Sequence, residues 1–262
     1  MDIILKLKEE LNVEKWQVEA AVKLIDEGNT IPFISRYRKE ATGALNDEVL
    51  RNLHERLLYL RNLEEKKAQV LKSIEEQGKL TEDLKLAITN AQTLVVVEDL
   101  YRPYRPKRRT RATIAKEKGL EPLAQLIWMQ MTKKPLEEEA KVFVSEEKEV
   151  KNVQEALAGA QDILAEMVSD EADYRIHIRK MTFDNGRITS VAKDSEAKTV
   201  YEMYYNFEEP VKKIAGHRIL ALNRAEDEKV LTVKVEAPEY DILSYLEKLF
   251  SIIRIGINEK FP

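Results

Sequence analysis

The stretch NDEVLRNLHERLLYLRNLEEKKAQVLKSIEEQG, residues 46–78, is the longest continuous helical pattern in the sequence. Asn46 is a typical helix-capping residue, and Asp47 and Glu48 put negative charge in the first turn, where it complements the helix dipole. Neither glycine nor proline interrupts the stretch before Gly78. Apolar residues recur mostly at steps of three and four, at Val49, Leu50, Leu53, Leu57, Leu60, Leu63, Val70, Leu71 and Ile74. The pattern predicts one amphipathic helix about 50 Å long, which supports other helices or projects as half of an antiparallel pair.

Helical patterns also surround this stretch, and they predict a mainly α fold. TLVVVEDLY has a run of valines typical of a strand, but its helical neighbours favour a helix there. AGAQDILAE, residues 158–166, has small residues on one side, which indicates close helix packing. Further helices are expected over 2–11, 13–27, a short segment that ends by Gly43, a segment that begins at Thr81, 150–168 and 170–183.

Beyond Gly186 the residue pattern changes from helical to partly strand-like. RITSVA and VLTVKVEA alternate polar and apolar residues and predict short strands. Between them we expect helices in KTVYEMYYNF and HRILALNRAEDE, and a last helix over 240–256. The sequence therefore predicts a helical region over 1–195 and a small α+β subdomain over 196–262.

The composition indicates a soluble protein without disulfide bonds. The chain has 262 residues, of which 44% are hydrophobic and 34% charged, and it contains no cysteine. The amino-terminal residues have the pattern of neither a signal peptide nor a transit peptide, and no apolar run approaches the roughly 20 residues that span a bilayer. We expect a cytoplasmic protein without membrane association.

Positive charge is concentrated in one segment. DLYRPYRPKRRTRATIAKEKG, residues 99–119 and here called the connector, lies in a chain whose net charge is -4. Between Arg102 and Lys118 it carries one acid, Glu117, so this part has a charge of +7 and the remainder has -11. The basic residues of the connector are Arg102, Arg105, Lys107, Arg108, Arg109, Arg111, Lys116 and Lys118.

The connector fits two interpretations equally. In the first interpretation the connector binds a polyanion. Arginine suits phosphate because its planar guanidinium group donates two hydrogen bonds to adjacent oxygens. Tyr101 or Tyr104 could stack on an unpaired base. Pro103 and Pro106 are expected to hold the backbone extended, so that neighbouring arginine side chains project in different directions. In the other interpretation, the arginines dock on carboxylates of this chain or of a partner and the tyrosines pack. A second basic cluster, Arg36-Tyr37-Arg38-Lys39, is interpreted as structural from its residues alone.

Motifs of catalysis are missing from the sequence. The glycines are too far apart for GxGxxG or a P-loop, and no serine has the GxSxG setting. His54, His177 and His217 have no partner at metal-ligand spacing. We expect no catalytic site, no cofactor and no metal, and hence no enzymatic activity.

Four long segments closely resemble the amino-terminal region of the Tex family of bacterial transcription accessory proteins. They are NTIPFISRYRKEATGALNDEVLRNLHERLLYLRNLEE, EEQGKLTEDLKLAI, EDLYRPYRPKRRTRATIAKEKGLEPLA and ALAGAQDILAE, and GHRILALNRAEDE extends the similarity more weakly. The resemblance implies a mainly helical region with a helix-turn-helix-like unit, in a cytoplasmic protein that binds RNA or DNA and assists transcription. It also implies that this chain is an amino-terminal part. Longer relatives continue into a YqgF-type domain, helix-hairpin-helix elements and an S1 domain, on which their nucleic-acid binding relies heavily.

Ten basic residues are candidate nucleic-acid contacts by this resemblance. Arg36, Arg38, Lys39, Lys107, Arg108, Arg109 and Lys116 match the family position by position; Arg102 and Arg105 match more loosely, and Arg111 belongs to the same run. The chain departs from the family at Gln161, at Ala215-Gly216 and at Ala225, so no role is carried over to that last region. The leading hypothesis is a non-enzymatic, nucleic-acid-binding scaffold. Its rival is an architectural scaffold that docks on further domains or on the transcription machinery.

Overall fold

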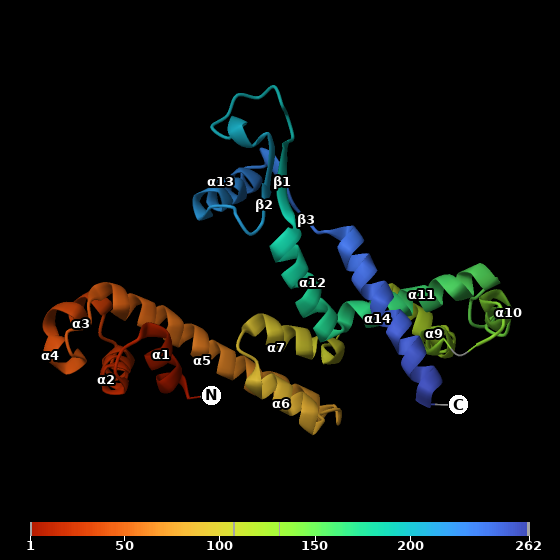
Figure 1. Ribbon diagram of the computed structural model, residues 1–262, viewed down its shortest axis with the longest axis horizontal. Coiled ribbons are helices and arrows are strands. Elements are labelled where there is room, and N and C mark those ends of the chain that lie inside the picture. The colour runs from red at the N-terminus through yellow and green to blue at the C-terminus, as the bar shows by residue number, and fades with distance from the viewer. Residues whose placement is uncertain (1, 107, 131, 261–262) are drawn as a thin grey trace. The chain divides into compact units, whose positions relative to one another are not determined.

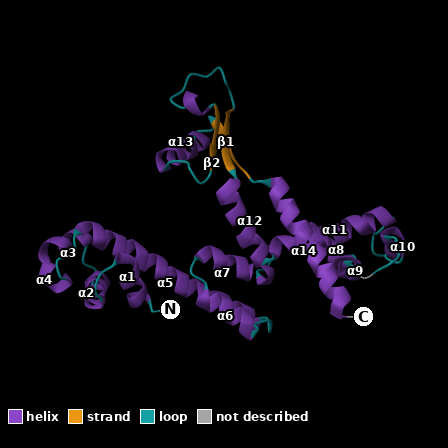
Figure 2. Cartoon of the chain, in the orientation of Figure 1, coloured by secondary structure: helices purple, strands orange, loops and turns teal. Residues whose placement is uncertain are grey.

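The computed structural model describes residues 2–106, 108–130 and 132–260, and the chain divides into two units, Met1–Arg105 and Pro106–Pro262. Figure 1 labels their elements, and Figure 2 shows that helices predominate and that the labelled strands form one small sheet. The predicted mainly α fold with a small β portion is thereby confirmed. The predicted domain boundary at residue 195 and the helix-turn-helix-like unit stay predictions.

The first unit is built along one long helix. Its elements are α1 (Ile3–Leu11), α2 (Lys15–Asp26), α3 (Ile31–Tyr37), α4 (Lys39–Thr42), α5 (Asp47–Glu76), α6 (Glu82–Asn90), α7 (Leu94–Tyr101) and a 3₁₀ turn, Arg102–Tyr104. The Oδ1 of Asn46 accepts a hydrogen bond of 2.8 Å from the amide of Val49, so the predicted cap and the predicted long helix are both confirmed. Thr81 caps α6 in the same way, and TLVVVEDLY is helical as α7.

The two halves of α5 carry two separate cores. Leu50, Leu53 and Leu57 pack with α1, α2 and α3 in one core, whereas Leu63 and Ile74 pack with α6 and α7 in the other. Because the apolar stripe of α5 follows the helical repeat along its whole length, it can face both groups of helices. The long helix thus supports other helices, which is one of the two arrangements expected from the sequence.

In the helical part of the second unit, α8 (Arg111–Glu117), α9 (Glu121–Met129) and α10 (Leu136–Lys141) pack around α11 (Val153–Asp170), which α12 (Ala172–Asn185) also contacts. The other described helices of this unit are α13 (Gly216–Asp227) and α14 (Glu239–Lys260). Ala156 and Ala160 on α11 are fully buried, and a Cβ at Gly159 would lie 2.3 Å from the Cδ1 of Leu120. Small side chains therefore bring α11 against α8 and α9, as the sequence predicted for AGAQDILAE.

The sheet has three antiparallel strands in the order β2-β1-β3. They are β1 (Arg187–Ala192), β2 (Asn206–Pro210) and β3 (Leu231–Glu236). Ser190 on the central strand lies opposite Phe207 and Val233, and one face of the sheet packs with α13 over a core that contains Leu222.

The expected helix in KTVYEMYYNF is wrong. Within that segment, Glu202–Tyr204 form a single 3₁₀ turn, and Asn206 begins β2. The physical reason is tertiary pairing: β1 offers one edge to β3, and the segment that contains Phe207 pairs with the other edge. Tyrosine and phenylalanine are also common in strands, so the local preference did not oppose this outcome.

Aromatic contacts attach the last helix to the helical part of the second unit. The ring of Phe250 on α14 lies 5.3 Å from Trp128 on α9 and 6.4 Å from Tyr174 on α12, and Tyr245 stacks on His177 at 4.0 Å. In the part of the chain that the structure describes, no helix combines the length and the apolar character needed to cross a membrane.

Candidate nucleic-acid interface

The connector is distributed over both units. Its first part contains the end of α7 and the 3₁₀ turn of the first unit, and its later part contains α8 of the second. The expected extended backbone occurs at Arg105, before Pro106, but Pro103 instead lies in the 3₁₀ turn. Proline fits this position because its fixed φ suits a first helical turn and the amide that it lacks is not needed there.

The two tyrosines of the connector pack against α5. The hydroxyl of Tyr101 lies 3.0 Å from the Oγ of Ser73, and the carbonyl of Tyr104 accepts a hydrogen bond of 3.0 Å from the Nε2 of Gln77. Both rings are partly buried in the core that contains Ile74. These contacts agree with the packing interpretation of the tyrosines and leave their rings poorly placed to receive a base.

The cations in the later part of the connector meet carboxylates at the surface. The Nη2 of Arg109 lies 2.8 Å from the Oε2 of Glu117 on α8. Lys116 and Arg111 reach two carboxylates of α11, at 4.0 Å from Glu166 and 3.3 Å from Asp162. Each cation is exposed, so these ion pairs are accessible to water rather than part of the core.

Two further connector cations differ in their surroundings. Arg108 is exposed and has no carboxylate within 4.0 Å among the described residues, whereas Arg105 in the first unit lies 4.0 Å from Glu98. Arg102 is also exposed. Lys107, another predicted contact, lies outside the described residues.

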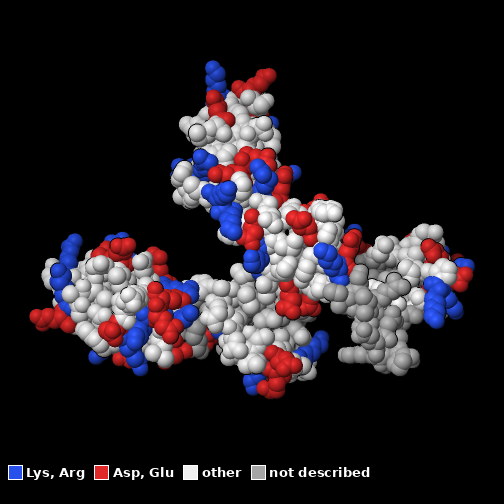
Figure 3. All heavy atoms as spheres, in the orientation of Figure 1, with Lys and Arg blue, Asp and Glu red and all other residues white. Residues whose placement is uncertain are grey.

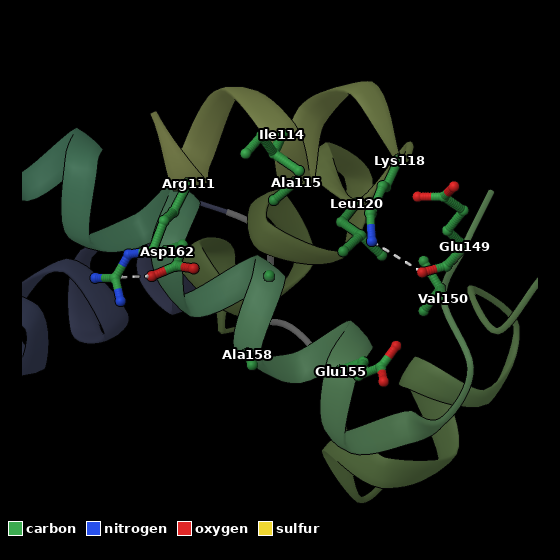
Figure 4. A pocket seen from close by; sticks show the side chains of 11 residues that line it. Arg111, Ile114, Ala115, Lys118, Leu120, Glu149, Val150, Glu155, Ala158 and Asp162 are labelled. Atoms are coloured by element: carbon green, nitrogen blue, oxygen red, sulfur yellow. Dashed lines mark hydrogen bonds and ion pairs between the residues drawn. The ribbon is translucent and has the colours of Figure 1, made fainter. Parts of the chain in front are cut away.

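A pocket of about 260 Å³ is lined by residues of α8 and α11, and its cations are Arg111 and Lys118. Figure 4 shows Arg111 directed from α8 toward Asp162 on α11, and Lys118 directed toward the carbonyl of Glu149, which accepts a hydrogen bond of 2.9 Å. The pocket is smaller than the ~300–1,000 Å³ of most ligand sites. A nucleic-acid strand could therefore meet these side chains only on the outer surface.

The second predicted cluster lies where α3 meets α4. Arg38 has φ -127° and ψ 27°, which interrupts the helix between Tyr37 and Lys39. A left-handed Gly43, with φ 61°, ends α4. The Nε2 of Gln17 donates to the carbonyl of Gly43 at 3.1 Å, so α2 fixes the position of this segment.

The cations of this segment, Arg36, Arg38 and Lys39, are exposed and have no carboxylate within 4.0 Å among the described residues. We call them the α3–α4 cations. Other arginines of the same unit are paired: Arg51 with Asp47, Arg56 with Glu10, Arg61 with Asp26 and Arg105 with Glu98. Figure 3 shows basic and acidic side chains interspersed over the part that contains α1 to α5, on the face drawn. The α3–α4 cations are therefore distinguished by missing partners rather than by a large basic field.

Aromatic rings accompany the α3–α4 cations. The ring of Tyr37 lies 5.4 Å from that of Phe33, and the guanidinium carbon of Arg38 lies 5.1 Å from the Phe33 centroid. Tyr37 itself is 67% exposed. Sequence reasoning singled out Tyr37 but not Phe33, although their separation of four residues on a helix is the signal that places them side by side.

The predicted contacts thus form three groups rather than one constellation. The α3–α4 cations and the Arg102–Arg105 group lie toward opposite ends of α5, a helix about 45 Å long. The third group, Arg108, Arg109, Arg111 and Lys116, lies in the second unit. Within the described residues, no set of three or more His, Asp or Glu side chains is arranged to hold a metal ion.

Comparison with known proteins gives matches along most of the chain. The model of the Tex-like protein N-terminal domain matches residues 1–75, and the Tex central region-like model matches residues 130–259. YdcI of Bacillus subtilis is 46% identical over 93% of this chain and 34% of its own length. The transcriptional accessory protein Tex of Neisseria gonorrhoeae is 43% identical over 90% of this chain and 31% of its own length.

A more distant relative comes from an animal. The human S1 RNA-binding domain-containing protein 1 is 32% identical over 89% of this chain and 24% of its own length. The chain spans about a third of the length of the bacterial relatives and about a quarter of the human one.

Proposed function

The chain belongs to the Tex family of transcription accessory proteins, and we propose that it acts as a non-enzymatic scaffold whose exposed cations help to bind RNA or DNA. The name of the human relative, which refers to an S1 RNA-binding domain, supports RNA as the ligand. We place this activity in the cytoplasm, in contact with nucleic acid during transcription and with the transcription machinery as a further partner.

The observation that carries the proposal is the exposure of the connector cations of the second unit. Arg108, Arg109 and Arg111 are all exposed, and Arg108 has no carboxylate partner within the described part of the chain. Ion pairs at an exposed surface stabilise a protein by only about 0–1 kcal/mol. A phosphate that approaches Arg109 or Arg111 can therefore replace the carboxylate at little cost in stability.

The rival function, an architectural scaffold, is favoured by a different observation. The pairs Arg109–Glu117, Arg111–Asp162 and Lys116–Glu166 join the connector and α8 to carboxylates of the same unit. In this function, the cations of the connector stabilise the packing of the unit through these ion pairs, and nucleic acid binds elsewhere in the longer relatives.

Charge reversal separates the two functions. The double variant Arg108→Glu/Arg109→Glu is compared with the unaltered chain in gel-shift binding to RNA and DNA and in thermal unfolding. Nucleic-acid binding predicts lost affinity with a nearly unchanged melting temperature. An architectural role predicts a large fall in melting temperature with binding unchanged, and that result would reject the proposed function.

The non-enzymatic part of the proposal has its own test. Purified chain is incubated with labelled RNA and DNA in the presence of Mg²⁺ or Mn²⁺. We expect both polymers to remain intact, and metal-dependent cleavage would show the proposal to be wrong.

A further inference from the structure

We propose that the exposed ring of Tyr37 stacks on an unpaired base of a bound nucleic-acid strand, while the α3–α4 cations contact the adjacent phosphates. The inference rests on the proposed function, because it assigns a particular contact to nucleic-acid binding. It adds a base-contacting residue in the first unit, whereas the connector cations of the second unit contact only the backbone.

The position of Tyr37 leaves its ring available. Tyr37 is the last residue of α3, and the non-helical backbone of Arg38 turns the chain away immediately after it. Phe33, one helical turn earlier, lies behind the ring at a centroid distance of 5.4 Å and an interplanar angle of 43°. Phe33 is only partly exposed, so it limits the freedom of the Tyr37 ring from one side. A ring that is already restrained loses less conformational entropy when a base stacks on it.

The charges around the ring fit the chemistry of a single strand. Arg36 precedes Tyr37, and Arg38 and Lys39 follow it, so cations flank the aromatic residue on both sides in the sequence. Phosphates likewise flank each base of a strand. Aromatic rings that accept bases beside cations that contact phosphates are the usual composition of single-strand binding surfaces.

The missing carboxylates are the second observation. Arg51 and Arg61 of the same unit show that its exposed arginines readily find acidic partners. The α3–α4 cations have none among the described residues, although Glu40 is adjacent in the sequence. Cations without internal partners need not break an ion pair before they bind an external anion. The guanidinium of Arg38 is in addition held 5.1 Å from the Phe33 centroid, which keeps it beside the aromatic pair.

Tyr37→Ala tests the stacking directly. The whole chain is titrated by fluorescence anisotropy into two single-stranded oligonucleotides of equal length, one of them abasic at every position. We expect the unaltered chain to prefer the oligonucleotide with bases, and Tyr37→Ala to lower its affinity for that oligonucleotide about tenfold. Affinity for the abasic strand should stay the same, because the alanine variant keeps every phosphate contact.

Two control variants make the comparison specific. Tyr37→Phe keeps the ring and should bind as the unaltered chain does. Tyr240→Ala removes a tyrosine that is 82% exposed but lies between Glu239 and Asp241, and it should leave affinity for both strands unchanged. Circular dichroism should show that each variant keeps its helical content, because the substituted side chains are exposed.

The experiments distinguish failure of the proposed function from failure of the stacking inference. If the unaltered chain binds neither strand at low salt, the proposed function fails and the inference fails with it. If the chain binds and Arg108→Glu/Arg109→Glu weakens binding, but Tyr37→Ala binds both strands normally, the proposed function stands and the stacking inference is wrong. In that case, normal binding by Arg36→Ala/Arg38→Ala as well would exclude the α3–α4 cations as nucleic-acid contacts.

Discussion

The Nη2 of Arg111 lies 3.3 Å from the Oδ1 of Asp162 and joins α8 to α11, although 85% of the Arg111 side chain remains exposed. An exposed pair of this kind contributes about 0.2–1 kcal/mol. Asp162 therefore competes with any phosphate that approaches Arg111, but it does not hold the arginine firmly. The same relationship holds in weaker form between Lys116 and Glu166, which are 4.0 Å apart.

Removal of Asp162 should strengthen nucleic-acid binding. In Asp162→Asn the Arg111 guanidinium loses its internal carboxylate, so we expect affinity for RNA or DNA to rise about two- to fivefold, in line with the loss of a weak competing pair. The free energy of unfolding should fall by less than about 1 kcal/mol. Fluorescence anisotropy and urea unfolding measure the two quantities.

Asp26→Asn is the matched control for that variant. It releases Arg61, which is not a predicted nucleic-acid contact, from a bidentate surface pair in the first unit, and it should leave binding unchanged. A fall in stability of several kcal/mol in Asp162→Asn without a gain in affinity would support the architectural role of the connector instead.

Gly43→Ala should destabilise the first unit. Gly43 has φ 61°, a left-handed conformation that costs other residues about 1–2 kcal/mol. An added Cβ would also lie 2.5 Å from the Cη2 of Trp16 and 2.6 Å from the Nε2 of Gln17, whose hydrogen bonds fix this turn. We expect a loss of about 2–4 kcal/mol in the free energy of unfolding.

Gly28→Ala provides the comparison. Gly28 also has a positive φ, of 84°, but a Cβ there would meet no atom within 4 Å. It should lose only the backbone contribution of about 1–2 kcal/mol. Equal losses in the two variants, measured by chemical unfolding, would show that the close approach of Trp16 and Gln17 does not matter.

The contact between Gly159 and Leu120 should show strong coupling. A Cβ at Gly159 would lie 2.3 Å from the Cδ1 of the buried Leu120 and 3.3 Å from the Cβ of Ala115. Gly159→Ala should therefore cost about 1–3 kcal/mol, and Leu120→Ala about 2–5 kcal/mol. Because Leu120→Ala removes the clashing atom, the double variant should lose clearly less than the sum of the two. Additive losses in urea unfolding would contradict this packing.

Asp184 should stabilise the second unit in a manner that depends on pH. Hydrogen bonds from Lys180 and then Lys212 lower the pKa of Asp184 from 3.8 to about 2. A carboxyl group whose pKa is lowered in the folded state stabilises that state above about pH 4, and this contribution disappears as the pH falls toward 2. Asp184→Asn should therefore have a lower urea midpoint than the unaltered chain at pH 6, and the difference should vanish near pH 2. A difference that does not change with pH would contradict the two lysine contacts.

The helical part of the fold could be predicted because its signals are local. The apolar repeat of Leu53 and Leu57, the Asn46 cap and the Gly43 stop each act within a few residues, and the structure confirms each. The strand β2 could not be predicted in this way. Its residues form a strand because β1 has a free edge beside them, and that fact depends on pairing across the sheet rather than on KTVYEMYYNF itself.

The candidate site was predictable only as a set of residue types. The sequence located the arginines but could not tell that Arg111 meets Asp162 across 51 positions, or that Arg36 meets no carboxylate among the described residues. Ion pairing between distant helices depends on their packing, which periodicity does not specify. The structural interpretation of Arg36 to Lys39 stays untested, although their missing partners motivate the opposite proposal.

The measurement that tests the central claim most directly is the salt dependence of nucleic-acid affinity. The dissociation constant of the whole chain is measured by fluorescence anisotropy with RNA and with DNA from about 50 to 200 mM salt. If the connector contacts about four phosphates, the logarithm of the association constant should fall with the logarithm of the salt concentration at a slope of about -3 to -4. Arg108→Ala/Arg109→Ala should make this slope shallower by about 1.5. A slope near zero, or an identical slope in the double variant, would contradict nucleic-acid binding by these arginines.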